Sequence, residues 1–261
     1  MTWRAGADEP REAGPILVEE RGEGVRLITI SRPARRNALD ERAFKTLAEA
    51  LSSAATDDGA RVVALTGAGG VFTSGADLAD FQLEAGEGAL AAAFEFLNVL
   101  RVFPKPLLAA VEGFAVGVGT TLLLHCDFAY AGREARFRLP FVPLGLCPEG
   151  GSSLLLPRVA GAKRAAELLM LGEPFGAREA AEAGLVTGVV ADGEALGVVL
   201  EKAARLAGMP PAALAATKAL LRRGLMDEVA SAMRREAEAF AALRGAPCAQ
   251  AAFKAFFAKT G

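Results

Sequence analysis

The sequence predicts an α/β fold that ends in a helical region. Through the first two thirds, β-rich runs alternate with segments of helical periodicity in a β-β-α rhythm, whereas the last third is helical and rich in alanine. No linker-like stretch divides the 261 residues, and 52% of them are hydrophobic, which is enough to bury a sizeable core. We therefore expect a single functional domain with a loose arm over 1–14, an α/β core over 15–191 and a C-terminal helical region over 192–261.

The first half of the chain gives clear local signals. Gly22, Glu23 and Gly24 separate two β-rich runs and indicate a hairpin. Asp40 is placed to cap a helix, and Pro104 ends a later one. The elements expected here are a hairpin over 16–31, a helix from 41 to about 55, a strand over 61–67 and a helix over 89–103.

The second half begins with strands and continues as helices. Gly172 and Gly184 are placed to end helices, because glycine readily adopts the left-handed conformation of a helix C-terminus. The tail helices have wide apolar faces, which favours packing on another subunit. We expect strands over 107–113, 127–132 and 135–139, a helix opened by glycines within 116–126, and helices over 162–171, 176–183, 194–207, 211–223, 227–243 and 247–259.

Charge and cysteine content exclude several classes of partner. The net charge is −2 and no basic face is evident, so we expect no nucleic-acid and no membrane partner. The three cysteines are scattered, which predicts neither a disulfide framework nor a zinc site; we expect no metal and a reducing, cytoplasmic compartment. The acidic N-terminus lacks the apolar core of a signal peptide.

Two glycine-containing loops, "TSGAD" (73–77) and "GVGTT" (117–121), are candidates for binding. Gly75 and Gly117 let the backbone approach a ligand closely, so that N–H groups of these loops can point into a cavity. The alternative is that these glycines only allow tight turns. "GVGTTL" lacks the third glycine of a dinucleotide fingerprint.

Three segments together resemble the crotonase, or enoyl-CoA hydratase/isomerase, superfamily. They are "LITISRPARRNALD" (27–40), "ALTGAGGVFTSGADL" (64–78) and the long segment 105–190, and the closing "AAFKAFFAKTG" is similar as well. The resemblance implies a crotonase-like ββα spiral with a C-terminal helical trimerisation region. It also implies an acyl-CoA thioester substrate, no cofactor beyond the CoA of that substrate, and a homotrimer or a hexamer built as a dimer of trimers.

The resemblance further assigns roles to residues of the two loops. It implies that the N–H groups of Ala76 and Val118 form an oxyanion hole, although the register at Gly117, Val118 and Gly119 can slip by one. Arg35 and Arg36 are either solvated charges or contacts to CoA phosphates, and the resemblance favours contact. Further expected contacts to substrate are Gly75, Asp77, Leu78, Gly117 and Phe141, with apolar lining near Phe72 and Phe81 and a further cation from Lys254 or Lys259.

Glu149 in "LGLCPEGGSSLLL" is the candidate catalytic residue. In one interpretation, a carboxylate just before a helix has no further role than a favourable interaction with the helix dipole. However, apolar neighbours would raise its pKa to a range suited to proton transfer, and Gly150 and Gly151 would leave room for a ligand. "PEGGSS" also resembles the segment of the superfamily's enoyl-CoA isomerases in which the glutamate is the catalytic base.

Two departures from the superfamily's hydratases favour isomerisation. The two glutamates that hold and activate water there fall at Thr121 and Phe141 here, and neither is acidic. A double-bond shift from 3-enoyl-CoA to 2-enoyl-CoA needs only one base. The alternatives are an enoyl-CoA hydratase or another crotonase-type lyase, and, in another class, a non-catalytic acyl-CoA-binding protein.

Other polar residues in these segments are expected to be structural. His125, the only histidine, lies at an apolar helix end, which favours a core or interface position. This also argues against a Ser-His hydrolase built from Ser74, Ser152 or Ser153. Asp127 resembles the superfamily's structural aspartate.

Overall fold

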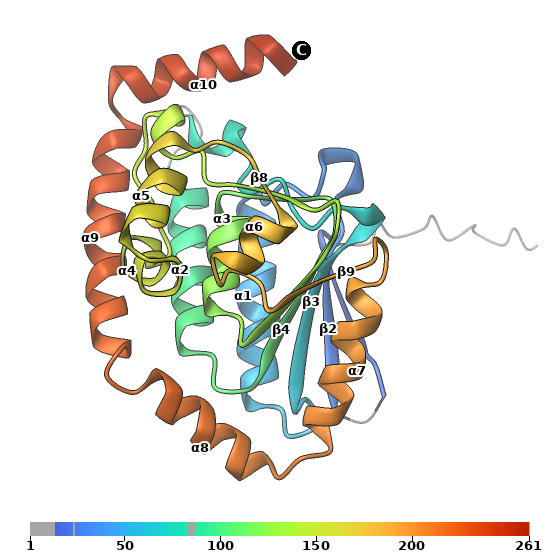
Figure 1. Cartoon of the computed structure of the whole chain (residues 1–261). Coiled ribbons are helices and arrows are strands. Elements are labelled where there is room, and N and C mark those ends of the chain that lie inside the picture. The colour runs from blue at the N-terminus through green and yellow to red at the C-terminus, as the bar shows by residue number, and fades with distance from the viewer. Residues whose placement is uncertain (1–13, 23, 83–86, 261) are drawn as a thin grey trace, which may run out of the picture.

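The computed structural model of the chain describes residues 14–22, 24–82 and 87–260 (Figure 1). The predicted arm over 1–14 therefore lies, apart from Gly14, outside the described residues. The described residues form two sheets covered by helices, and the longest helices gather on one side of the larger sheet (Figure 1).

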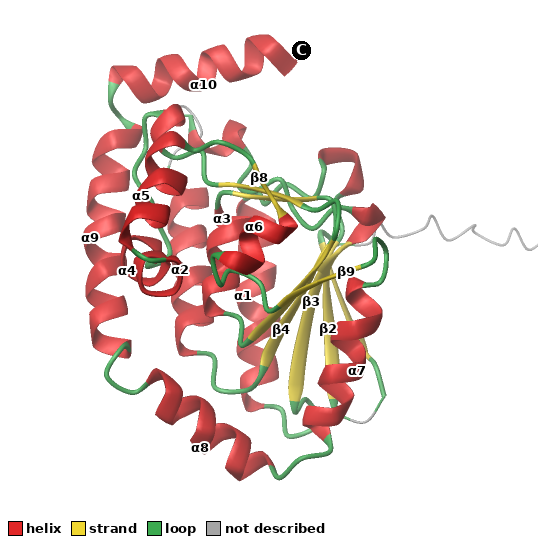
Figure 2. Ribbon diagram, viewed as in Figure 1, coloured by secondary structure: helices red, strands yellow, loops and turns green. Residues whose placement is uncertain are grey.

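A six-stranded sheet forms the centre of the molecule (Figure 2). Its strand order is β1-β2-β3-β4-β6-β9; β1 pairs antiparallel with β2, which confirms the predicted hairpin, and the other pairs are parallel. Parallel sheets are buried on both faces, so their strands are nearly continuous apolar runs. The strands are β1 (Ile16–Glu20), β2 (Val25–Ile30), β3 (Val62–Gly67), β4 (Leu107–Val111), β6 (Phe128–Gly132) and β9 (Gly188–Val190).

A second, three-stranded sheet has the order β5-β7-β8. The chain passes directly from β4 to β5 and from β6 to β7, so each pair gives its first strand to the large sheet and its second to the small one. A helix follows each pair, which produces the predicted β-β-α rhythm. The strands are β5 (Phe114–Val116), β7 (Arg136–Arg138) and β8 (Phe175–Gly176); the short β8 and β9 were not predicted.

Helices cover both faces of the large sheet. Alternate residues of β2 face opposite sides: Leu27 packs in a cluster with α7 (Ala195–Ala207), while Ile28 packs in the larger cluster that includes α1 (Glu41–Thr56) and α2 (Gly88–Val102). The carboxylate of Asp40 accepts a hydrogen bond from the Ala43 N–H at 2.8 Å, which confirms the predicted cap of α1.

The remaining helices bring the end of the chain back to the turn that follows β7. α9 packs against α2 and α4, and α10 lies over the turn at 142–144. Across the described residues, no helix is both long and apolar enough to cross a lipid bilayer. These helices are α3 (Val118–Thr121), α4 (Ser152–Ala160), α5 (Ala162–Leu171), α6 (Ala177–Glu182), α8 (Pro211–Arg222), α9 (Met226–Arg244) and α10 (Pro247–Thr260).

Candidate active site

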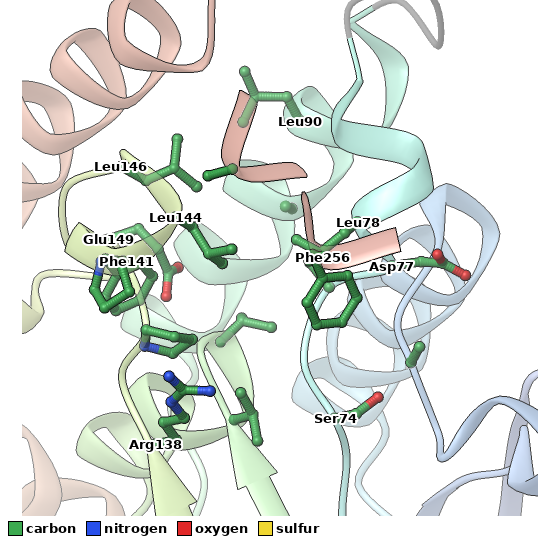
Figure 3. Close-up of a pocket in the computed structure, with 18 of the residues that line it drawn as sticks. Ser74, Asp77, Leu78, Leu90, Arg138, Phe141, Leu144, Leu146, Glu149 and Phe256 are labelled. Carbon is green, nitrogen blue, oxygen red and sulfur yellow. The ribbon is translucent and has the colours of Figure 1, made fainter. Parts of the chain in front are cut away.

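A cavity of about 1030 Å³ lies between the two glycine-containing loops and the turn that carries Glu149 (Figure 3). Residues 74–78 form one wall, and residues 138–149 lie opposite, with side chains from α2, α9 and α10 completing the lining. All of the predicted site residues except Gly75 and Gly117 line it: Arg35, Arg36, Ala76, Asp77, Leu78, Val118, Phe141 and Glu149.

The first loop is joined by backbone hydrogen bonds to β5, the strand that leads into the second loop. The Thr73 N–H donates to the Phe114 carbonyl at 2.9 Å, and the Val116 N–H donates to the Thr73 carbonyl at 3.1 Å. Gly75 has φ +89°, and a Cβ there would lie 2.5 Å from the Val116 carbonyl oxygen. Only glycine therefore permits this close approach, and the approach places Ala76 on the same cavity as the start of α3.

Ala76 and Val118 each present an unused N–H group. Neither N–H donates a hydrogen bond within the described part of the chain. Gly117, with φ 54° and ψ −119°, turns the chain into α3, and Val118 is the first residue of that helix, so its N–H has no intrahelical acceptor. An oxyanion hole requires two such unused N–H groups, and both residues that carry them line one cavity. That role stays a prediction.

Glu149 lies in the turn before α4 and is buried, with 6% of its surface exposed. Its Oε1 accepts a hydrogen bond from the Thr121 hydroxyl at 2.5 Å. Burial raises the pKa of Glu149 to about 8; the Thr121 hydrogen bond lowers this pKa, and the negative charge of Glu236 raises it. A carboxyl group with such a pKa is suited to both taking and giving a proton near neutral pH.

A second buried glutamate, Glu236 on α9, occupies the start of α4. It accepts hydrogen bonds from the Gly151 N–H at 2.6 Å, the Ser153 N–H at 2.9 Å and the Ser153 hydroxyl at 2.5 Å. If Glu149 served only to interact with the helix dipole, these N–H groups would be its hydrogen-bond donors. The sequence contained no signal for Glu236, since it lies more than 80 residues further along the chain.

Two expectations were wrong, one about the space beside Glu149 and one about the apolar lining of the cavity. Gly150 and Gly151 do not leave room for a ligand: an added Cβ would lie 3.2 Å from Leu97 of α2 at the first position and 3.0 Å from Val229 of α9 at the second. They allow two helices to pack closely against the turn instead. Phe72 is fully buried in the core and does not line the cavity, while the side chain of Phe81 lies outside the described residues.

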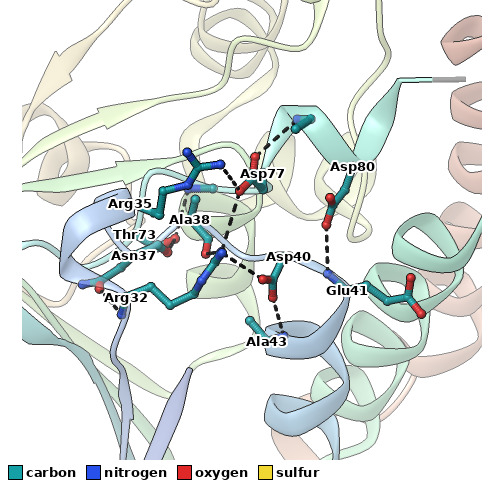
Figure 4. A network of polar contacts seen from close by, with 12 residues as sticks. Arg32, Arg35, Asn37, Ala38, Asp40, Glu41, Ala43, Thr73, Asp77 and Asp80 are labelled. Carbon is teal, nitrogen blue, oxygen red and sulfur yellow. Dashed lines mark hydrogen bonds and ion pairs between the residues drawn. The ribbon is translucent and has the colours of Figure 1, made fainter. Parts of the chain in front are cut away.

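An ionic network holds the loop at the opposite wall (Figure 4). Arg32 pairs with Asp40 at 2.8 Å and with Asp77 at 3.8 Å, and Arg35 pairs with Asp77 at 3.3 Å. The Asp77 carboxylate also accepts the Ala79 N–H at 3.3 Å. Asp77 therefore lines the cavity with its charge already compensated.

The other predicted cations differ in placement. Arg36 is exposed, has a left-handed φ of 50°, and makes no ion pair with a described residue. Lys254 is exposed on α10 and does not line the cavity, and the side chain of Lys259 lies outside the described residues. Of the cations expected to contact CoA whose side chains the structure describes, Arg35 and Arg36 lie at the cavity and Lys254 does not.

His125 and Asp127 have structural surroundings, as predicted. His125 Nε2 lies 2.7 Å from the Gly150 carbonyl, and burial lowers the pKa of His125 to about 4, so the ring is neutral and donates this hydrogen bond. Asp127 accepts hydrogen bonds from the Leu107 N–H at 2.8 Å and from Lys218 Nζ at 2.7 Å. The Ser152 hydroxyl donates to the Glu149 carbonyl at 2.6 Å, so it makes no pair with the histidine.

Comparison with known proteins identifies the family. The family model described as "Enoyl-CoA hydratase/isomerase" matches residues 20–260. The chain belongs to the enoyl-CoA hydratase/isomerase family. Among curated members, "Enoyl-CoA delta isomerase 2" of Rattus norvegicus is 37% identical over 234 residues, covering 87% of this chain and 59% of its own length. The chain thus spans about three fifths of that relative.

Other members of the enoyl-CoA hydratase/isomerase family match over nearly their full length. The "2,3-dehydroadipyl-CoA hydratase" of Escherichia coli is 36% identical over 248 residues, covering 93% of this chain and 96% of its own. The solved structure of OdaA from Pseudomonas aeruginosa is 40% identical with a TM-score of 0.88, covering 94% of this chain and 99% of its own. The predicted crotonase fold is therefore confirmed.

Proposed function

We propose that this protein isomerises 3-enoyl-CoA to 2-enoyl-CoA, with Glu149 as its single proton carrier. The observation that carries the proposal is a buried carboxyl group with a raised pKa at a cavity whose other described acidic lining residue, Asp77, is already paired with Arg35. Isomerisation needs one group that takes a proton from one carbon and returns it to another.

The proposed sequence of events uses groups on both walls. The ionised Glu149 removes a proton from C2, and the electrons shift into the thioester to give an enolate with its double bonds conjugated. The Ala76 and Val118 N–H groups stabilise the negative oxygen. Protonated Glu149 then returns the proton to C4, which leaves the double bond between C2 and C3 and restores the base.

The neighbours of Glu149 support this assignment over hydration. Thr121 donates its hydroxyl to the carboxyl group, and Phe141 presents an apolar ring to the cavity. Hydration requires a group that positions and deprotonates a water molecule, and neither side chain is basic. The relatives include both a delta isomerase and a hydratase by name, so hydration remains the second candidate.

One assay separates the candidates. Purified protein is mixed with 3-enoyl-CoA and, separately, with 2-enoyl-CoA, and the position of the double bond is followed by absorbance and mass. We expect rapid conversion of the first and slow water addition to the second. Efficient addition of water to the second would favour the hydratase, and binding without conversion of either would favour the non-catalytic alternative.

The remaining assignments concern CoA and assembly. We assign Arg35 and Arg36 to the CoA phosphates, since both are basic, exposed and line the cavity. Replacing both should weaken acyl-CoA binding and spare the fold.

We also assign a homotrimer or hexamer, because α8 exposes Leu220 at 64% and Leu221 at 76%. Sedimentation as a stable 27.0 kDa monomer would contradict the assembly.

A further inference from the structure

Arg138 is a cation on the cavity wall without an acidic partner among the described residues. It ends β7, and its Nε donates to the Gly172 carbonyl at 2.8 Å, which anchors one edge of the guanidinium. No carboxylate of the described residues forms an ion pair with Arg138, and its two terminal nitrogens donate to none of the described groups. Arg138 is exposed, its side chain is anchored at Nε, and the donors of both terminal nitrogens are unused within the described part of the chain.

The guanidinium points into the cavity rather than away from it. Figure 3 shows it below Phe141 and Glu149, on the wall that faces Ser74. Pro140 and Pro143, which follow it closely in the chain, also line the cavity and offer no acceptor side chain. A fixed, planar fork of donors beside apolar groups matches the two oxygens of a carboxylate or a phosphate.

A comparison within β7 distinguishes Arg138 from Arg136. Arg136 lies two residues earlier and projects on the same side of the strand, but it pairs with Glu134 at 3.0 Å and does not line the cavity. Arg35, on the opposite wall, is paired with Asp77. Of these three arginines, only Arg138 both lines the cavity and has no ion-pair partner in the described part of the chain.

We propose that Arg138 binds an anionic oxygen group of the substrate through its two terminal nitrogens. The inference rests on the proposed function only in taking an acyl-CoA as the ligand of this cavity. The shared chemistry is an oxyanion with two acceptors, which has two sources: a second carboxylate on the acyl group, or a phosphate of the CoA. A carboxylate would make dicarboxylic enoyl-CoA esters the preferred substrates.

Affinity measurements with unreactive ligands test the proposal without requiring turnover. Hexanoyl-CoA, adipoyl-CoA and hexanoyl-pantetheine have no double bond to shift, so their dissociation constants are measured by calorimetry on the full-length protein. The variant is Arg138→Met, and Arg136→Met is the matched control, since it removes the same charge from the same strand outside the cavity. Because no chemistry is involved, failure of the isomerase proposal would leave this test intact.

We expect Arg138→Met to weaken one class of ligand by roughly ten- to a hundredfold, as expected for losing a charged hydrogen-bonded pair, with Arg136→Met unchanged. A loss confined to adipoyl-CoA identifies a carboxylate. An equal loss for both CoA esters, absent for hexanoyl-pantetheine, identifies a phosphate. Unchanged affinity for all three ligands, or an equal loss for all three, overturns the proposal and leaves Arg138 as an anchor for Gly172.

A second variant guards against loss of the fold. Arg138→Gln keeps an N–H donor for the Gly172 carbonyl and removes the charge. If Arg138→Met unfolds at a lower urea concentration than the wild type, the same three affinities are measured on Arg138→Gln. The same outcomes then apply to this variant.

Discussion

Glu149 and Glu236 lie on neighbouring segments of the interior with the same exposed fraction, 6%, and opposite surroundings. Glu236 accepts three hydrogen bonds from the start of α4, whereas the carboxyl group of Glu149 accepts one, from Thr121, and faces the cavity. A buried carboxylate is stabilised as an anion in proportion to the donors around it. Equal burial therefore leaves one glutamate fully engaged in hydrogen bonds to the start of α4 and the other as a cavity-facing group that can exchange its proton.

Replacing each glutamate should break a different property of the protein. For Glu149→Gln we expect isomerisation to fall by about a hundredfold or more, since the amide keeps size and polarity but cannot carry the proton. Binding of a saturated acyl-CoA should change little, because the CoA contacts remain. Turnover of 3-enoyl-CoA and calorimetric affinity measure the two effects. Full activity in this variant would leave Glu149 without a catalytic role.

For Glu236→Ala we expect the free energy of unfolding to fall by about 1–3 kcal/mol, because the buried N–H groups of Gly151 and Ser153 lose their acceptor. Urea denaturation of this variant beside Glu149→Gln measures the contrast, since the latter should be no less stable than the wild type at neutral pH. If the two variants lost equal stability, the proposed division of roles would be wrong.

The raised pKa of Glu149 gives activity and stability opposite responses to pH. A base acts when deprotonated, so kcat/KM should rise about tenfold per pH unit below a midpoint of about 8 and then level off. Stability should follow the reverse course: because the folded-state pKa lies above the ordinary 4.5, the contribution of the protonated group is complete below pH 4.5 and is lost as the pH rises through about 8.

A pH–rate profile tests the first response, and urea unfolding at about pH 5 and about pH 8.5 tests the second, with Glu149→Gln as the control. Lys218 also has a pKa lowered to about 8 by burial, but it is common to both proteins, so their difference reports Glu149. A rate midpoint near 4.5 would show that burial does not govern this group.

The smallest expected effects are shifts of the pH–rate midpoint when Thr121 or Glu236, the two neighbours that act on the pKa of Glu149, is replaced. The Thr121 hydroxyl lowers the pKa of Glu149 and the charge of Glu236 raises it, while His125 on the adjoining turn is neutral. The rate midpoint should therefore move to higher pH in Thr121→Val and to lower pH in Glu236→Gln. At neutral pH we expect Thr121→Val to lower the rate by roughly five- to tenfold, the worth of one hydrogen bond.

These opposite shifts are measured from pH–rate profiles of the two variants beside the wild type. A general loss of packing would shift both midpoints in the same direction. That outcome would contradict the opposite effects assigned to Thr121 and Glu236. Thr121→Ser should restore the wild-type midpoint, since it keeps the hydroxyl group that donates to Glu149.

The sequence alone determined the fold class and the local features of the site. Glycines at 75 and 117, the cap at Asp40, the hairpin over 16–31 and the position of Glu149 before a helix all depend on residues close together in the chain. Such features can be predicted from local backbone preferences and from the periodicity of apolar residues. The resemblance of three segments then indicated the crotonase fold, which the comparisons confirm.

Only the tertiary structure decided which hydrogen-bond donors surround Glu149 and which surround Glu236. Thr121 lies 28 residues from Glu149, and Glu236 lies 85 from Gly151, and nothing in their spacing records that they meet. The same holds for Arg138, whose anchor at Gly172 is 34 residues away. A hydrogen bond depends on distance and direction in space, so the partners of a buried charge, and with them its pKa, become definite only when separate elements pack together.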